Sequence, residues 1–97
     1  MDMQSLSRLL DADGRVVRYP AKFGKRVYAI LYIAGKFESG RTYTELEVNE
    51  CIRAWILFAD YVLVRRDLVD YGCLTRTPDC REYKRVDVLP SAEQIIQ

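Results

Sequence analysis

The sequence contains no histidine. This removes the side chain that most often binds metals in proteins and most often acts as a general base near neutral pH. Only three cysteines occur, Cys51, Cys73 and Cys80, and neither their odd number nor their spacing indicates a disulfide framework. A zinc site normally needs four ligands, so no metal is expected. We expect reduced thiols, with a redox-sensing role for one of them as the alternative.

Long hydrophobic runs are also absent. The longest apolar stretch, Val27 to Ala34, has eight residues, whereas a transmembrane helix needs roughly 18 or more. Residues 1–5 have neither the basic head nor the apolar body of a signal peptide. We therefore expect a soluble, cytoplasmic protein that makes no membrane contact.

Catalytic patterns are missing as well. There is no glycine-rich phosphate loop, and none of the serines lies in a nucleophile-elbow motif. The carboxylates show no pairing beyond ordinary helix spacing. The sequence therefore predicts a protein that binds a partner, without enzymatic activity and without a cofactor.

What is present is ample material for one hydrophobic core, because 49% of the 97 residues are hydrophobic. We expect a single domain over residues 1–97. Within it, residues 1–14 would be an N-terminal extension, residues 15–86 the core and residues 87–97 a C-terminal tail.

The apolar residues predict three main helices. Between residues 21 and 37 they recur at steps of four and three, which makes one apolar face of a largely buried helix. A second helix is expected from Thr44, which forms a capping box with Glu47, to about residue 57. A third begins at the N-cap Asp60 and ends at Gly72, a residue suited to a left-handed C-terminal cap.

The remaining segments are shorter. Residues 73–77 and 81–86 have β character and are joined by a turn at Pro78 and Asp79. Residues 41–43 can add one small strand. Short helical turns are expected at residues 1–10 and 90–97, and residues 15–20 are expected to be extended.

This order predicts an α+β fold, specifically a winged helix-turn-helix with a three-helix core and a small antiparallel β-hairpin as the wing. The third helix would be the recognition helix. The element order carries this prediction independently of any motif.

Three segments also carry a resemblance to a known family. Residues 41–50 resemble "GRxYxExEVN", residues 60–74 resemble "DYAxLRRxLVDYGLL", and residues 81–85 resemble "xxYWR". All three are motifs of bacterial domain-of-unknown-function family 2087, and the resemblance spans roughly residues 15–85. It implies a winged-helix-like domain, sometimes attached to helix-turn-helix regulators. The chain departs from the motifs at Leu63, at Cys80, where glycine is common in the turn, and at Lys84, where tryptophan is usual.

Charge is informative through its distribution, since the net charge is only +1. Cations cluster in three places, and no acid lies between Gly14 and Phe37. We expect a DNA-binding, transcription-regulatory domain in which these cations contact DNA. They are Arg65 and Arg66 of the third helix, Arg76, Arg81, Lys84 and Arg85 of the wing, and Arg15, Arg18, Lys22, Lys25 and Arg26 of a basic N-terminal arm.

The sequence also supports an alternative. Asp60, Asp67 and Asp70 outnumber the two arginines of the third helix and would repel phosphate. The chain could instead be a protein-interaction or homodimerisation module, with Tyr28, Tyr32 and Trp55 at the interface. In that case the basic arm would pair with the acidic helix of a second copy.

Overall fold

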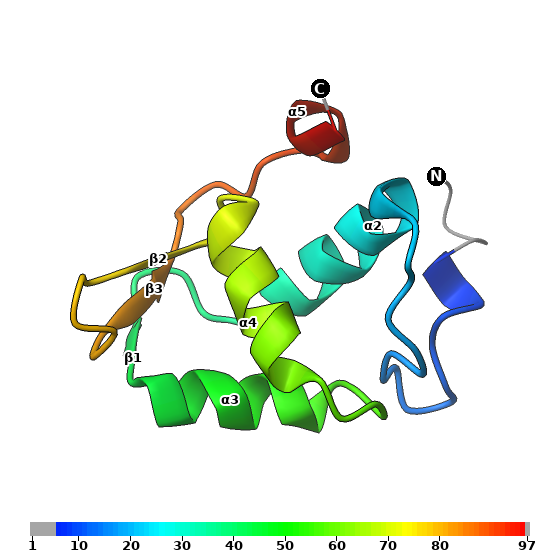
Figure 1. Cartoon of the computed structure of the whole chain (residues 1–97), viewed down its shortest axis with the longest axis horizontal. Coiled ribbons are helices and arrows are strands. Elements are labelled where there is room, and N and C mark those ends of the chain that lie inside the picture. Colours follow the sequence, from blue (N-terminus) through cyan, green and yellow to red (C-terminus); the bar gives the residue numbers. More distant parts are fainter. Residues whose placement is uncertain (1–5, 97) are drawn as a thin grey trace.

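The computed structural model describes residues 6–96 and has an α+β architecture of helices and one small antiparallel sheet (Figure 1). The α+β class predicted from the sequence is confirmed. The elements are α2 (Phe23–Ala34), β1 (Thr42–Tyr43), α3 (Glu45–Ala54), α4 (Tyr61–Asp70), β2 (Leu74–Arg76), β3 (Tyr83–Arg85) and α5 (Ala92–Ile96).

The three main helices form where the periodicity predicts them, but α2 is shorter at both ends and α3 ends at Ala54, before the predicted end near residue 57. α2 stops at Ala34, before the predicted end at Phe37, because Gly35 begins a turn there. Phe37 still belongs to the core, being 1% exposed. Residues 6 and 7 are helical, and the rest of the predicted first turn lies partly in residues 1–5, outside the described chain.

Local capping fixes the starts of α3 and α4. The Thr44 hydroxyl accepts a hydrogen bond from the Glu47 amide, and the Glu47 carboxylate accepts one from the Thr44 amide. Asp60 accepts from the Leu63 amide at 3.2 Å. Both predicted N-caps are thus confirmed.

The end of α4 is a Schellman motif. The Cys73 amide donates to the Leu68 carbonyl, and the Gly72 amide donates to the Val69 carbonyl. Gly72 has a φ of 83°, as its predicted role requires. This motif turns the chain directly from α4 into β2.

The sheet is antiparallel, and β3 lies between β1 and β2. In this register Tyr43, Tyr83 and Arg76 share one face, and Thr42, Lys84 and Thr75 share the other. Tyr43 and Tyr83 are buried whereas Lys84 is exposed. The first face therefore points to the core and the second to solvent.

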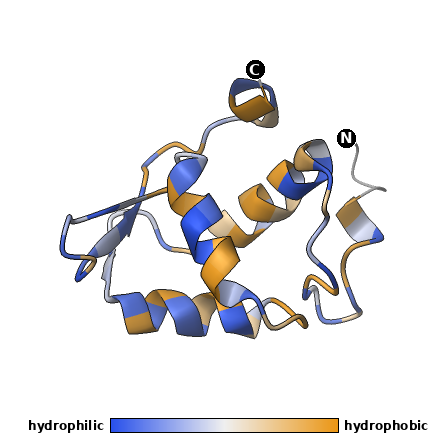
Figure 2. Ribbon diagram, viewed as in Figure 1, coloured by the Kyte–Doolittle hydropathy of each residue, from blue (hydrophilic) through white to orange (hydrophobic). Residues whose placement is uncertain are grey.

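One core joins α2, α3, α4 and the sheet. α2 is hydrophobic over most of its length, while α3 and α4 alternate between hydrophobic and hydrophilic residues (Figure 2). That difference agrees with burial, because five of the 12 residues of α2 are buried, against two of ten in α3 and three of ten in α4. The core includes Ile30, Ile33, Phe37, Val48, Ile52, Val64, Leu68, Leu74 and Tyr83.

The N-terminal segment is docked onto the body of the protein. Val16 is fully buried, forms bridges to Leu10 and Ile56, and exchanges backbone hydrogen bonds with residues 55 and 57. Residues 15–20, which are predicted to be extended, make these contacts through Val16. Within residues 6–96, no helix is both long and apolar enough to span a membrane.

Candidate functional site

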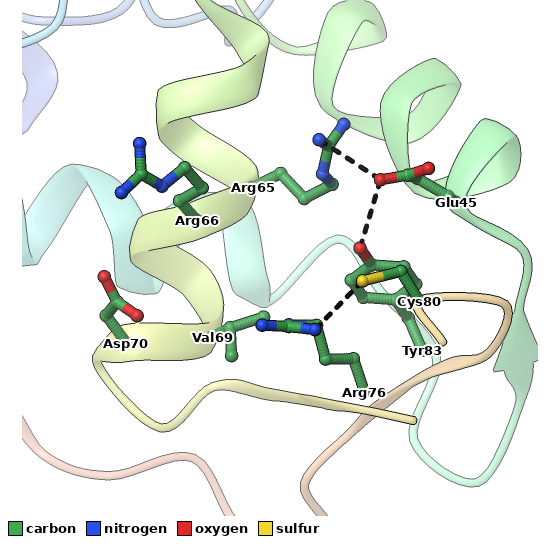
Figure 3. A pocket seen from close by; sticks show the side chains of 8 residues that line it. All are labelled: Glu45, Arg65, Arg66, Val69, Asp70, Arg76, Cys80 and Tyr83. Carbon is green, nitrogen blue, oxygen red and sulfur yellow. Dashed lines mark hydrogen bonds and ion pairs between the residues drawn. The ribbon is translucent and has the colours of Figure 1, made fainter. Parts of the chain in front are cut away.

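A hollow lined largely by polar side chains lies between α4, the start of α3 and the connection from β2 to β3 (Figure 3). It has a volume of about 330 Å³. Its position follows from the Schellman motif, which sends β2 back alongside α4. The hollow is lined by Glu45, Arg65, Arg66, Val69, Asp70, Arg76, Cys80 and Tyr83, so it joins predicted contacts of the third helix and the hairpin.

Arg65 links α4 to α3 rather than facing outward. Its guanidinium donates to the Asn49 side-chain oxygen at 2.6 Å and lies 3.2 Å from the Glu45 carboxylate. Its side chain is only 16% exposed. Glu45 also accepts from the Tyr83 hydroxyl at 3.3 Å, and burial together with this carboxylate raises the pKa of Tyr83. The positive charge of Arg65 is therefore largely compensated within the protein.

Arg66 and Arg76 are in a different situation. Both are exposed, and within residues 6–96 neither forms an ion pair with a carboxylate. The Arg76 guanidinium donates to the Cys80 sulfur at 2.9 Å. Figure 3 shows Arg66 leaving α4 on another side from Arg65. These two guanidinium groups are the uncompensated cations of the hollow.

The other hairpin cations are spread over different surfaces. Arg81 is 86% exposed on its side chain and lies 3.7 Å from Asp79. Lys84 is on the solvent face of the sheet. Arg85 is half-buried and donates to the Phe37 carbonyl at 2.9 Å. Only Arg76 of this group faces the hollow.

The acids of α4 are less repulsive to an anion than their number suggests. Asp60 caps the helix, and Asp67 is buried, with 7% of its surface exposed. Of these three acids, only Asp70 lines the hollow. The expectation that three carboxylates of α4 oppose phosphate is therefore reduced to one in the hollow itself.

Asp67 forms the centre of a compact polar cluster. It accepts a hydrogen bond from the Tyr19 hydroxyl at 2.5 Å and lies 3.7 Å from the Arg26 guanidinium. Arg26 also donates to the Pro20 carbonyl and stacks over the Tyr19 ring. Burial and the Asp67 carboxylate raise the pKa of Tyr19 well above its usual range. This cluster fastens the N-terminal segment and α2 to α4.

The remaining cations of the basic arm divide into two sets. Arg15 pairs with Asp11 at 3.0 Å and with Asp13 at 3.3 Å. Hydrogen bonds from the backbone amides of Arg15 and Asp13, together with the Arg15 guanidinium, hold the pKa of Asp11 below its usual value. Arg18, Lys22 and Lys25 line a second hollow. Arg8, which sequence reasoning missed, lines the same hollow, because the folded N-terminal segment brings it near the start of α2.

Of the three predicted interface aromatics, Tyr32 and Trp55 lie close to Gly14 of the docked N-terminal segment. The Tyr32 hydroxyl donates to the Gly14 carbonyl at 2.6 Å. The Lys36 ammonium lies 4.6 Å from the Tyr32 ring centre and 4.0 Å from that of Trp55. Tyr28 is half-buried on the same helix as Tyr32. The structure brings Tyr32 and Trp55 together, and both have partners within the chain.

All three cysteines are free thiols. Burial raises the pKa of Cys73 to about 11 and also raises that of Cys51, so both stay protonated near neutral pH. Cys80 has a φ of 61°, in the left-handed region that favours glycine. This agrees with the glycine expected in the turn. Among residues 6–96, no group of three or more histidine, cysteine or acidic side chains could hold a metal ion.

The chain is thus a small α+β domain in which several of the cations line two separate hollows. Residues 15–85 match the model of the domain-of-unknown-function family 2087, described as an uncharacterized protein conserved in bacteria. The match covers well over half of the chain, so the protein belongs to this family, and the resemblance noted in the sequence is confirmed. Comparison with curated proteins and with solved structures gives no significant match.

Proposed function

We propose that this protein is a winged-helix domain that binds double-stranded DNA through α4 and the β2–β3 hairpin, in a transcription-regulatory role. The observation that carries the proposal is the pair of uncompensated arginines, Arg66 and Arg76, which approach one hollow from α4 and from β2. Guanidinium groups bind phosphate through two parallel hydrogen bonds. A helix and a hairpin that each present a guanidinium group to one hollow can bind the phosphates of one DNA backbone.

The element order supports the winged-helix assignment. After α2, a short strand, two helices and a hairpin follow, and β1 completes the sheet beside β3. In such domains the second helix of the pair enters the major groove and the hairpin contacts the flanking backbone. In this proposal α4 acts as the recognition helix and the β2–β3 connection as the wing.

α4 also presents a narrow exposed stripe. Val62, Arg66 and Asp70 follow one another at steps of four and are all exposed. In a major groove, Val62 could contact a thymine methyl group and Arg66 a guanine edge or a phosphate. Arg65 acts differently in this proposal, because its bonds to Glu45 and Asn49 fix the angle between α3 and α4.

A binding titration over a range of salt concentrations tests the proposal. Three phosphate contacts, from Arg66, Arg76 and Arg81, predict a slope of about −3 for log affinity against log salt, since each contributes about −0.9. A fluorescent duplex of mixed sequence is sufficient for the measurement. Failure to bind even at low salt would refute the function.

The alternative, a homodimerisation module with Tyr28, Tyr32 and Trp55 at the interface, stays a prediction. The half-exposed rings of Tyr32 and Trp55 support it, because they lie together on one surface. Sedimentation at micromolar concentration distinguishes the two. A strict monomer would contradict the alternative and leave DNA binding untouched.

A further inference from the structure

The second hollow lies where the N-terminal segment meets the start of α2, and the proposed DNA contact does not use it. It has a volume of about 350 Å³, within the range of roughly 300–1,000 Å³ that is usual for small-molecule pockets. It shares no residue with the hollow beside α4. In Figure 1 the sheet and the N-terminal segment lie at opposite ends of the molecule.

All charged side chains that line this hollow are cations: Arg8, Arg18, Lys22 and Lys25. None of the four forms an ion pair with a carboxylate in the described part of the chain. Arg15 and Arg26, from the same arm, are both paired. The fold thus compensates two cations of the arm and collects the others around one concavity, where they repel one another unless an anion enters.

The rest of the lining favours a compact ligand. Leu9 and Pro20 are buried and give the hollow an apolar wall between its cations. The first turn of α2 borders it through Lys22 and Lys25. That turn contains no acidic residue, and the N-cap Lys22 makes no side-chain capping bond, so the positive end of the helix dipole adds to the four side-chain charges.

We propose that this hollow binds a small phosphate-bearing anion. Four cations match an anion of more than one negative charge, and the two arginines can each bind phosphate oxygens in pairs. A concave site with an apolar wall fits a phosphorylated small molecule better than the exposed backbone of a duplex. The domain then has two separate anion sites, and the one at α2 is the place where a metabolite could be sensed.

The test uses the full chain and inorganic pyrophosphate, at constant ionic strength, followed by amide chemical shifts in NMR. We expect saturable shifts confined to residues 8–9 and 18–25. The double variant Arg18→Gln/Lys25→Gln should bind at least roughly tenfold more weakly, because each charge-assisted hydrogen bond contributes about that factor. Both side chains are exposed and unpaired within residues 6–96, so the variant should keep the wild-type fold.

The matched control is Arg81→Gln/Lys84→Gln, which removes one arginine and one lysine from the hairpin. It should leave pyrophosphate binding within about twofold, since short-range contacts outweigh screened long-range charge. Equal weakening by both double variants would overturn the proposal, because it would mean general attraction by net charge. So would the absence of saturable shifts.

A second experiment replaces pyrophosphate with the DNA duplex. We expect DNA to shift amides of α4 and the β2–β3 hairpin and to leave residues 18–25 unchanged. If DNA alone shifts residues 18–25, the small-anion proposal is overturned and the basic arm belongs to the DNA surface, as the sequence predicts. If pyrophosphate binds and DNA does not, the DNA proposal fails and the anion site stands.

Discussion

At the scale of single residues, Asp67 shows how much one buried carboxylate organises. It is the only polar or charged residue classed as buried within residues 6–96, and Tyr19 and Arg26 both approach it. A buried charge is tolerated only when it is paired and hydrogen-bonded. These contacts join the N-terminal segment, α2 and α4, and they hold the chain next to Arg18 and Pro20, which line the second hollow.

The protonation of Tyr19 gives a testable consequence. Its pKa is raised in the folded protein, whereas the unfolded phenol ionises near 10. Its contribution to stability is therefore complete below pH 10 and decreases above it, because the unfolded chain releases a proton that the folded chain retains. In Tyr19→Phe, unfolding should release about 0.5 proton fewer than in the wild type at pH 10 and about 0.9 fewer at pH 11, because the unfolded phenol is half ionised at pH 10.

Urea unfolding at several pH values measures this directly. Tyr71, Tyr83 and Cys73 also have raised pKa values and lower the stability at high pH in both proteins. The difference between wild type and variant isolates Tyr19. Identical pH slopes for the two proteins would show that burial and the Asp67 carboxylate do not keep Tyr19 protonated in the folded protein.

The left-handed backbone at Cys80 supports a second residue-level prediction. A φ of 61° costs an L-residue roughly 1 kcal/mol relative to glycine. Cys80→Gly should therefore raise the free energy of unfolding by about 1 kcal/mol, less the loss of the Arg76–Cys80 contact. Thermal denaturation with Cys80→Ala as the control measures it, since alanine removes the same contact without relieving the backbone. Equal stabilities of the glycine and alanine variants would contradict the argument.

At the scale of elements, neighbouring arginines on α4 have opposite roles. Arg65 bonds to two side chains of α3, whereas Arg66 extends to solvent. Arg65→Ala should lower the free energy of unfolding by about 1–2 kcal/mol, reduced from the buried value because Glu45 is partly exposed. Arg66→Ala should change it by less than about 0.5 kcal/mol. Chemical denaturation of both variants checks the pair, and equal losses would rule out the assigned roles.

Much of the element pattern could be predicted because its signals are local. Thr44 with Glu47, Asp60 and Gly72 all act within a few residues of the boundary they mark. The roles of individual side chains could not be predicted in this way. Asp67 and Tyr19 are 48 residues apart, and Arg65 and Asn49 are 16 apart. No periodicity links such partners, so the sequence predicts that Arg65 and Asp67 are both surface charges.

At the scale of the whole molecule, the organisation of charge matters more than its total. The net charge is +1, yet two hollows at opposite ends collect uncompensated cations. The sequence grouped the cations by position along the chain. The fold regroups them by joining Arg8 to the arm, pairing Arg15 and Arg26 internally, and turning Lys84 to the outer face of the sheet.

The most direct test of DNA binding compares salt slopes between variants. Arg66→Gln/Arg76→Gln should reduce the wild-type slope of about −3 to about −1, since two phosphate contacts are lost. Lys36→Gln is the control, because Lys36 lies against Tyr32 and Trp55, away from the hollow beside α4. It should leave the slope unchanged. An unchanged slope in the double variant would contradict the proposed interface.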